Sequence, residues 1–268
     1  PLTYTWDPLE TLLQYVRRNQ MVHLLCAPLA GVSAPIGLMD TVVLQNAELL
    51  AGIVLAQIIR PGAPVVYGPS ATAADLRSGD FFSGTPEGML INIANIQLAT
   101  RFYDIPARAM CGITDAKVAD YQAGFETMQN LMMGLLAGAH LLNDAVGIMD
   151  NLLTVSYVKT IIDCELIGRV KRIMEGIHGP DREMNIEMIK EVGHGGNYLL
   201  HDTTFERCRD RWRAPHSYCG SYSEWEKRGS LDIVRRANKT WKEILAAAPE
   251  TLIDPALEEE LKAYIDSE

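Results

Sequence analysis

Short apolar runs alternate with loops and long helical segments along this chain, and that order restricts the fold more than any other feature of the sequence. The first unit has a predicted buried strand at 21–27, a loop rich in Gly, Ser and Pro, and a helix at 38–59. Two strands joined through a helix must pair in parallel, because the helical crossover returns the chain to the same end of the sheet. The sequence therefore predicts an α/β fold. The later strands are predicted at 64–67, 107–111 and 140–143, and the later helices at 86–103, 121–137 and from about residue 150.

Loop lengths favour a (β/α)8 TIM-type barrel over a doubly wound sheet. The long loops follow strands and the short connections follow helices, as in a barrel whose site lies at the C-terminal strand ends. The doubly wound alternative lacks a GxGxxG or GxxxxGK[ST] phosphate loop. Four units make only part of a barrel. The missing strands are expected either within 170–205, for example around 197–200, or before residue 1. We favour the second, since the chain begins with Pro1 and not with Met.

Two regions are expected from the charge distribution. Residues 1–205 are predicted to form the barrel portion, which opens with a helix at 8–18, and residues 206–268 a peripheral helical C-terminal extension. Charged side chains become more frequent after about residue 165, where amphipathic helices are predicted at 165–175 and 185–192. The extension is expected to end in helices at 232–248 and 255–265.

The net charge indicates which partners to expect, and the cysteine spacing indicates the cellular location. A net charge of −10 argues against nucleic-acid or anionic membrane surfaces. The 5 cysteines lie at long spacings without a CxxC pair, which indicates a reducing, cytoplasmic location.

The apolar segment 38–59 contains Asp40, Glu48 and three amides, so we interpret it as a buried helix and expect no membrane span. A homo-oligomer is expected.

The densest group of polar residues follows the third predicted strand. It includes Asp115 and Lys117, and Gln122 and Glu126 lie four residues apart on the next helix. Lys117 has three possible roles: a Schiff-base lysine, an anchor for a substrate carboxylate, or half of a structural ion pair. Asp120 could serve simply as a helix N-cap.

Other candidate binding residues lie at strand ends or in loops. Asn143 and Asp144 end the fourth predicted strand and could fix a ligand, and Tyr67 ends the second, where an aromatic ring could face a cation. His201 lies in a polar loop sequence, HDTT. His23 lies inside a strand pattern and is interpreted as structural, as is His140. The 6 histidines show no HxxxH spacing, so no metal site is predicted.

Four segments in order resemble the trimethylamine methyltransferase superfamily. They are APLAGVSAPIGLMDTVVLQNAELLAGIVLAQIIRPGAPVVYG, GTPEGMLINIANIQLATRFYDIPAR, ITDAKVADYQAGFETM and LLAGAHLLNDAVGIMD. The likeness spans roughly residues 1–250 and corresponds to the C-terminal portion of longer (β/α)8 barrels. In the pyrrolysine-containing members that residue lies near the third strand end, which corresponds to 110–115 here. Only ordinary residues occur there, so the resemblance is to members without pyrrolysine that use glycine betaine or other quaternary amines.

The resemblance implies transfer of a methyl group from a methylated, quaternary amine to the Co(I) corrinoid of a separate partner protein. The corrinoid would then be supplied by that partner and not bound as a resident cofactor, and Co(I) is itself the nucleophile. It also implies a role in methylamine metabolism of the kind linked to methanogenesis. The candidate substrate-binding residues are Tyr67, Asp115, Lys117, Glu126, Asn143, Asp144 and His201, and no catalytic residue is assigned.

Two rival functions stay open from the sequence. The first is a Schiff-base lyase or aldolase barrel that uses Lys117. The second is a non-catalytic half-barrel that binds a partner chain through its open sheet edge.

Overall fold

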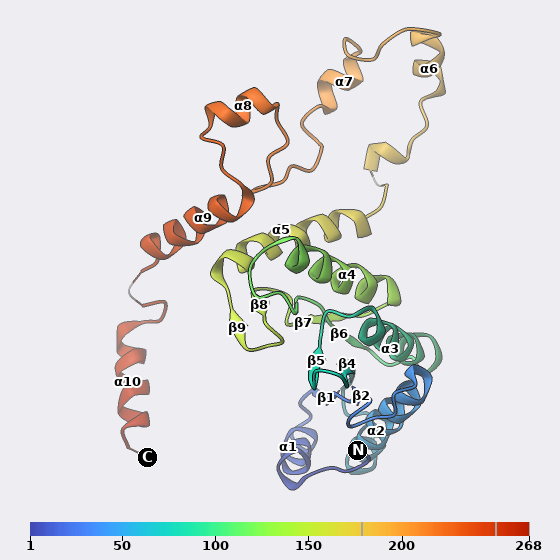
Figure 1. Ribbon diagram of the computed structural model, residues 1–268, viewed down its shortest axis with the longest axis vertical. Helices are drawn as coiled ribbons and strands as arrows, with labels where there is room; N and C mark the ends of the chain where they lie inside the picture. The colour runs from blue at the N-terminus through green and yellow to red at the C-terminus, as the bar shows by residue number, and fades with distance from the viewer. Residues whose placement is uncertain (178, 250, 268) are drawn as a thin grey trace.

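Four parallel strands lie side by side in the order in which they occur in the chain. The structure is a computed structural model that describes residues 1–177, 179–249 and 251–267 (Figure 1). Strand β1 (Val22–Cys26) pairs with β3 (Val65–Pro69), β6 (Arg108–Met110) pairs with β7 (Leu141–Asn143), and a bridge between Tyr67 and Ala107 joins the two pairs. This sequential order matches the barrel prediction, since a doubly wound sheet reverses its order at one point. No closed barrel forms among the described residues, so what is confirmed is an α/β fold with parallel strands.

Helices cover one face of these strands. They are α1 (Trp6–Arg17), α2 (Leu38–Ile59), α3 (Pro86–Gln97) and α4 (Tyr121–Ala137), which pack on consecutive strands and in Figure 1 follow one another around them, from α1 below to α4 above. Alternate strand residues such as Leu24, Tyr67 and Ala109 point to the helices and join the main hydrophobic core. The side chains between them therefore point to the opposite, inner face of the strands.

The main helices begin and end where the sequence signals predict. Helix α2 ends just before Pro61-Gly62, and α4 begins after Asp120, whose carboxylate accepts hydrogen bonds from the Gln122 and Ala123 amides. Gly138 ends α4 with φ +105°. The predicted helix at 86–103 is confirmed with one difference, because its last turn, Leu98–Phe102, is π-helical.

Short strands lie in two segments that were predicted as loops or helix. In the long loop after β3, strands β4 (Thr72–Asp75) and β5 (Asp80–Phe82) form a hairpin, and β4 also pairs with β2 (Leu29–Ala30). After β7, strands β8 (Ile148–Met149) and β9 (Thr154–Val155) form a second hairpin. The helix predicted from about residue 150, α5 (Tyr157–Met174), therefore begins at residue 157.

Two further expectations need correction. The helix predicted at 165–175 is the second half of α5 and not a separate element, because the helical pattern continues through it from Ser156, whose hydroxyl caps α5 at the Lys159 amide. Within 170–205, the residues whose structure is described form the end of α5, a 3-10 turn (Gly179–Arg182), α6 (Ile186–Val192) and the start of α7 (Asp202–Arg207), with no strand. Hidden barrel strands are thus not found in this segment, around 197–200 included.

The chain continues beyond α5 as a series of short helices connected by loops. The helices predicted at 185–192, 232–248 and 255–265 are confirmed as α6, α9 (Ile233–Ala247) and α10 (Pro255–Ile265). Helix α8 (Tyr222–Lys227) precedes α9, which packs on α5. Figure 1 shows α6, α7 and α10 standing away from the strands. The Glu165 carboxylate on α5 accepts hydrogen bonds from the backbone amides of His216 and Ser217, and so ties this segment to α5.

Helix α2 is the one described helix that is long and apolar enough to cross a membrane, with a mean hydropathy of 1.8 in its most apolar window. In the structure it packs against β1, β3 and α3. Its Gln45 side chain is fully buried and donates a hydrogen bond to the Cys26 carbonyl oxygen, at 2.9 Å. A buried amide with a partner inside the protein is typical of a core helix.

Candidate functional site

The inner face of the parallel strands carries several polar side chains whose hydrogen-bonding atoms are buried without a partner. In the described part of the chain these atoms are His23 Nε2 on β1, Arg108 Nε and Nη1 on β6, and Asn143 Oδ1 on β7. A buried polar atom without a partner costs free energy, and native proteins keep few of them. Their presence on one face of three strands indicates a place where a polar ligand could complete the hydrogen bonds.

Arg108 and Asp144 form the charged centre of this face. Arg108 is 2% exposed, and its Nη1 lies 3.5 Å from Oδ2 of Asp144, whose side chain is 40% exposed. Burial lowers the pKa of Arg108, and the Asp144 carboxylate partly opposes that effect. An arginine remains protonated in proteins, so the chain buries a cation with one loosely placed carboxylate beside it.

His23 lies next to this pair. Its Nε2 would be 2.7 Å from a Cβ at position 68, so the Gly68 on β3 leaves room for the imidazole. Burial and the positive charge of Arg108 lower the pKa of His23, and the ring is therefore neutral at pH 7. The expectation of a fully satisfied structural histidine is wrong here, because Nε2 has no hydrogen-bond partner among the described residues. His140, in contrast, accepts a hydrogen bond at Nδ1 from the Ala107 amide, at 3.4 Å.

Asn143 and Asp144, both predicted as site residues, lie beside Arg108. β6 and β7 are paired, with Met110 opposite Asn143. Asp144 follows directly and has φ +53°, a left-handed conformation that Asp adopts more readily than most residues. The structure thus brings these two predicted residues together with Arg108 and His23.

Asp115 and Glu126 also come together, at the C-terminal strand ends, but their oxygens are occupied by hydrogen bonds from the protein. Glu126 is 7% exposed, and its Oε2 accepts from Thr114 Oγ1 at 2.5 Å and from the Asp115 amide at 2.8 Å. Asp115 in turn accepts hydrogen bonds from the Ser83 amide and hydroxyl, both at 2.8 Å. The two carboxylates therefore hold the loop before α3 and the loop after β6 against each other.

Lys117 lies on the surface at the same end of the strands. Its side chain is 66% exposed, and its ammonium pairs with the Asp150 carboxylate. That hydrogen bond raises the pKa of Lys117. A Schiff-base lysine must be deprotonated to attack a carbonyl, which requires a depressed pKa. The surroundings of Lys117 favour the structural ion pair over the Schiff base.

Tyr67 lies on the opposite face of the strands, in the core beneath the helices. It is fully buried, and its hydroxyl lies 2.9 Å from Oδ1 of both Asn46 and Asn95. Asn95 Nδ2 donates in turn to Gln45 Oε1 at 2.7 Å. Tyr67 is therefore part of a buried polar network that connects β3 to α2 and α3. The structure does not place it beside Arg108 on the inner face.

His201 lies outside the strand region as well. It precedes α7, and its Nδ1 accepts a hydrogen bond from the Thr203 amide at 3.3 Å as a helix cap. Its Nε2 is 3.9 Å from Glu191. Across the ranges that the structure describes, no cluster of three or more His, Cys, Asp or Glu side chains has the arrangement of a metal site.

Arg108, like His23, is not among the site residues that the sequence patterns predict. It stands in the strand sequence ARAMCG, where an arginine between alanines interrupts an apolar run. A charged side chain inside a buried strand is rare unless it is paired, and that was the available signal. Cys111, three residues later, points into the core, and burial raises its pKa to about 12. A thiol with such a pKa is a poor nucleophile.

Known proteins resemble the chain over its full length. A sequence profile described as trimethylamine methyltransferase (MTTB) matches residues 1–268. The glycine betaine methyltransferase of Desulfitobacterium hafniense (strain Y51) is 37% identical over 266 residues, which are 99% of this chain and 55% of that protein. The trimethylamine methyltransferase MttB of Methanosarcina barkeri is 32% identical over 266 residues, or 99% of this chain and 53% of that protein.

A third relative acts on another betaine. The proline betaine:corrinoid methyltransferase of Eubacterium limosum is 35% identical over 214 residues, which are 79% of this chain and 44% of that protein. The chain spans about half the length of these curated relatives. With the full-length profile match and an identity above 30% along almost the whole chain, the sequence belongs to the trimethylamine methyltransferase family.

Proposed function

We propose that the four parallel strands are consecutive strands of a (β/α)8 barrel whose inner face binds a methylated quaternary amine that carries a carboxylate, such as glycine betaine. The methyl group would pass to the Co(I) corrinoid of a partner protein. The sequential strand order supports the barrel. The observation that carries the substrate class is the buried Arg108 guanidinium with two nitrogens that lack hydrogen-bond partners in the described chain.

A carboxylate is the ligand that fits Arg108 best. The planar guanidinium matches a carboxylate with two parallel N–H···O bonds, and burial strengthens such a charge-assisted pair. Asp144 alone leaves that capacity unused, because its Oδ2 is 3.5 Å from Nη1 and makes no hydrogen bond there. Two of the relatives are named for betaines, which join a quaternary ammonium to a carboxylate. Trimethylamine has no carboxylate and would leave Arg108 unsatisfied.

The quaternary ammonium of the same substrate would lie near the acidic side of the site. Asp144 is half-exposed and supplies a negative charge beside the inner face, and the Asn143 amide oxygen is an acceptor without a partner in the described chain. When a methyl group leaves, the C–N bond breaks and the nitrogen keeps the electron pair. The amine thus departs neutral and needs no proton from the protein. The corrinoid, when bound, supplies the nucleophile, so this chain's residues need only bind and orient the amine.

Calorimetric titration with matched ligands tests the substrate class. Glycine betaine and choline share the trimethylammonium group, but choline carries a hydroxyl in place of the carboxylate. If Arg108 binds the carboxylate, glycine betaine should bind at least tenfold more tightly than choline or trimethylamine. Equal affinity for betaine and choline would contradict the assignment of a carboxylate to Arg108.

A further inference from the structure

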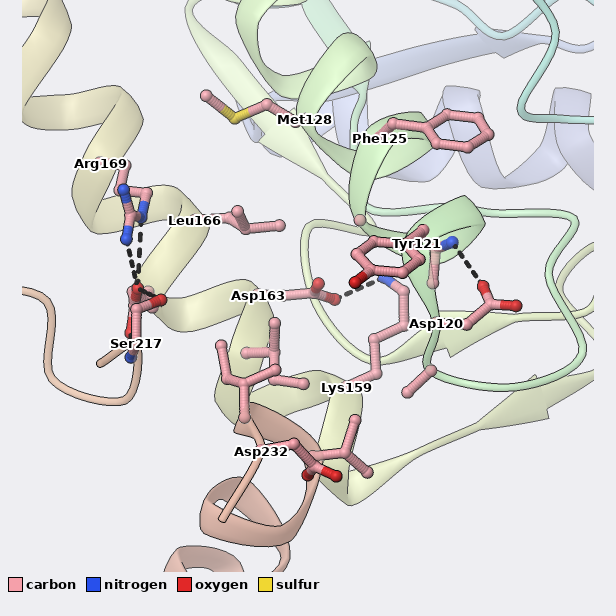
Figure 2. Close-up of a pocket in the computed structure, with 17 residues that line it drawn as sticks. Asp120, Tyr121, Phe125, Met128, Lys159, Asp163, Leu166, Arg169, Ser217 and Asp232 are labelled. Carbon is pink, nitrogen blue, oxygen red and sulfur yellow. Dashed lines mark hydrogen bonds and ion pairs between the residues drawn. The ribbon is translucent and has the colours of Figure 1, made fainter. Parts of the chain in front are cut away.

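A buried ion pair on α5 lies behind the strand-end loops. Lys159 and Asp163 are each 1% exposed, and Lys159 Nζ lies 2.5 Å from Asp163 Oδ2. Figure 2 shows the two side chains pointing toward each other at the wall of a cavity of about 770 Å³ between α4, α5 and the start of α9. Both residues are members of helix α5, one turn apart.

Each member of this pair also holds one strand-end loop. Lys159 Nζ donates a hydrogen bond to the Gly112 carbonyl oxygen at 2.7 Å, in the loop after β6. Asp163 Oδ2 accepts a hydrogen bond from the Gly147 amide at 2.8 Å, in the loop after β7. The ion pair thereby fixes the distance of both loops from α5.

Asp144 lies between Gly112, which Lys159 binds, and Gly147, which Asp163 binds. Its carbonyl oxygen accepts a hydrogen bond from the Gly112 amide at 2.8 Å, and Gly147 follows three residues later. Position 112 has no room for a side chain, because a Cβ there would lie 2.3 Å from the Asp144 carbonyl oxygen. Gly112 is therefore pressed against the backbone of Asp144 on one side and held by Lys159 on the other.

We infer that Lys159 and Asp163 are positioning residues that set where the Asp144 carboxylate lies relative to Arg108, and so shape the site from behind. The effect on substrate rests on the proposed function, whereas the effect on the two loops does not. In the described part of the chain, the hydrogen bonds of the two side chains go to each other, to the Gly112 carbonyl oxygen and to the Gly147 amide. Their influence passes through Gly112 and Gly147, whose hydrogen bonds fix the turn after β7 in its left-handed conformation at Asp144.

Stability alone is a weak reason for a chain to keep such a pair. Removing two charges from water costs several kcal/mol each, and well-packed apolar residues often replace a buried ion pair without loss of stability. Removing one partner, in contrast, leaves a buried charge and destabilises strongly. An apolar double replacement therefore separates the positioning role from the structural one.

The test is the double variant Lys159→Met/Asp163→Leu, for which the adjoining cavity offers room. Hydrogen–deuterium exchange followed by NMR reports on the Gly112 and Gly147 amides, and calorimetry reports on glycine betaine. We expect a melting temperature within a few degrees of the parent, at least tenfold faster exchange at Gly147, and at least tenfold weaker betaine binding. Unchanged exchange at both glycines in the folded double variant would overturn the inference.

A matched control lies further along the same helix. Arg169 pairs with Glu165 in the same i,i+4 arrangement, but Glu165 contacts His216 and Ser217 and not the strand-end loops. Arg169→Met should leave the exchange at Gly112 and Gly147 and the betaine affinity unchanged. If it speeds exchange at Gly147 as much as the double variant does, the effect is general to α5 and the inference fails.

A single substitution, Asp163→Asn, tests the same inference if the double variant does not fold. Asp163→Asn keeps the shape and an oxygen acceptor but removes the charge, and it should accelerate Gly147 exchange and weaken betaine binding together. If both the Gly147 exchange rate and the betaine affinity of Asp163→Asn equal those of the parent, the inference is overturned. Failure of the proposed function looks different: the parent would bind no betaine, while the exchange at Gly147 would still respond to Asp163. Fast exchange with full betaine affinity would contradict the positioning role.

Discussion

The Arg108 guanidinium, on β6, lies 3.5 Å from the Asp144 carboxylate in the turn after β7, yet its Nε and Nη1 make no hydrogen bond in the described structure. The Asp144 carboxylate therefore balances the charge of the guanidinium but accepts no hydrogen bond from Nε or Nη1. A second, external anion can bind to the same guanidinium, and this separates the inner face from an ordinary structural ion pair.

Loss of the Arg108 charge should weaken the binding of carboxylate-bearing amines specifically. Arg108→Gln is expected to reduce glycine betaine affinity tenfold to a hundredfold, about 1.4 to 2.8 kcal/mol, because a charge-assisted bond is lost. Binding of choline should change by less than threefold. Arg101→Gln, at an exposed position, is the matched control and should leave both affinities unchanged. A similar loss for betaine and choline in Arg108→Gln would point to a structural role. Calorimetry on the folded variants measures these affinities.

Glu126 should matter for stability through the loops that it holds. Glu126→Gln keeps one oxygen, which can accept from Thr114 and the Asp115 amide, but places an NH2 donor against Gln122 Nε2, which now donates to the other carboxylate oxygen. We expect the free energy of unfolding to fall by about 1 to 3 kcal/mol, since a buried donor loses its acceptor. Urea denaturation measures the change. Glu243→Gln, on the exposed side of α9, should change it by less than 0.5 kcal/mol, roughly the range of surface substitutions. An effect at Glu126 no larger than that of the control would refute the prediction.

Tyr67 tests the difference between the two faces of the strands. Tyr67→Phe removes a hydroxyl that lies 2.9 Å from Asn46 and Asn95, and should lower stability by about 1 to 2 kcal/mol. Amine affinity should stay within twofold of the parent, because the ring is buried on the helix-covered face. Chemical denaturation and calorimetry measure the two quantities. A tenfold loss of amine affinity with unchanged stability would place Tyr67 in the site instead.

The attachment of the C-terminal segment to α5 should depend on pH. Burial alone would raise the pKa of Glu165, but hydrogen bonds from Ser217, Arg169 and the His216 amide outweigh it and lower the pKa to about 2. An ordinary glutamate titrates near 4.5, so folding favours the ionised form. The resulting stabilisation is complete above pH 4.5 and is lost as the pH falls from 4.5 to about 2.

Glu165→Gln removes this titration. The difference in unfolding midpoint between the parent and Glu165→Gln should be constant above pH 5 and shrink as the pH falls from 4.5 toward 2. Urea denaturation at a series of pH values measures it, with Glu243→Gln as a control that should follow the parent throughout. A difference that stays constant down to pH 2.5 would show that Glu165 is not held in its ionised form.

Sequence patterns predicted the regular elements of the fold well where the local signals were strong. The Asp120 cap, Pro61-Gly62 and the Pro at position 86 bound helices that the structure confirms. The β8–β9 hairpin was missed, because its strands are two residues long and its turn has three left-handed residues, Asp150, Asn151 and Leu152, without a glycine. Such a turn is held by tertiary contacts, including the Lys117–Asp150 pair, which no local pattern reveals.

The candidate site was predictable only in part. The position of Asn143 and Asp144 at a strand end followed from periodicity, and the i,i+4 spacing correctly paired Gln122 with Glu126, whose side chains are 2.9 Å apart. Arg108 and His23 were not predicted as site residues, because their importance comes from burial without partners. That property depends on what packs around each strand, and it appears only when neighbouring strands such as β3, with Gly68, are in place.

Methyl transfer itself tests the central claim most directly. The protein is mixed with reduced Co(I) cobalamin and glycine betaine, choline or trimethylamine, and methylcobalamin formation is followed by absorbance. We predict methylation with glycine betaine, accompanied by release of dimethylglycine, and at least tenfold slower reaction with choline or trimethylamine. Equal rates with all three amines, or methylation from trimethylamine but not from glycine betaine, would contradict a site built around Arg108.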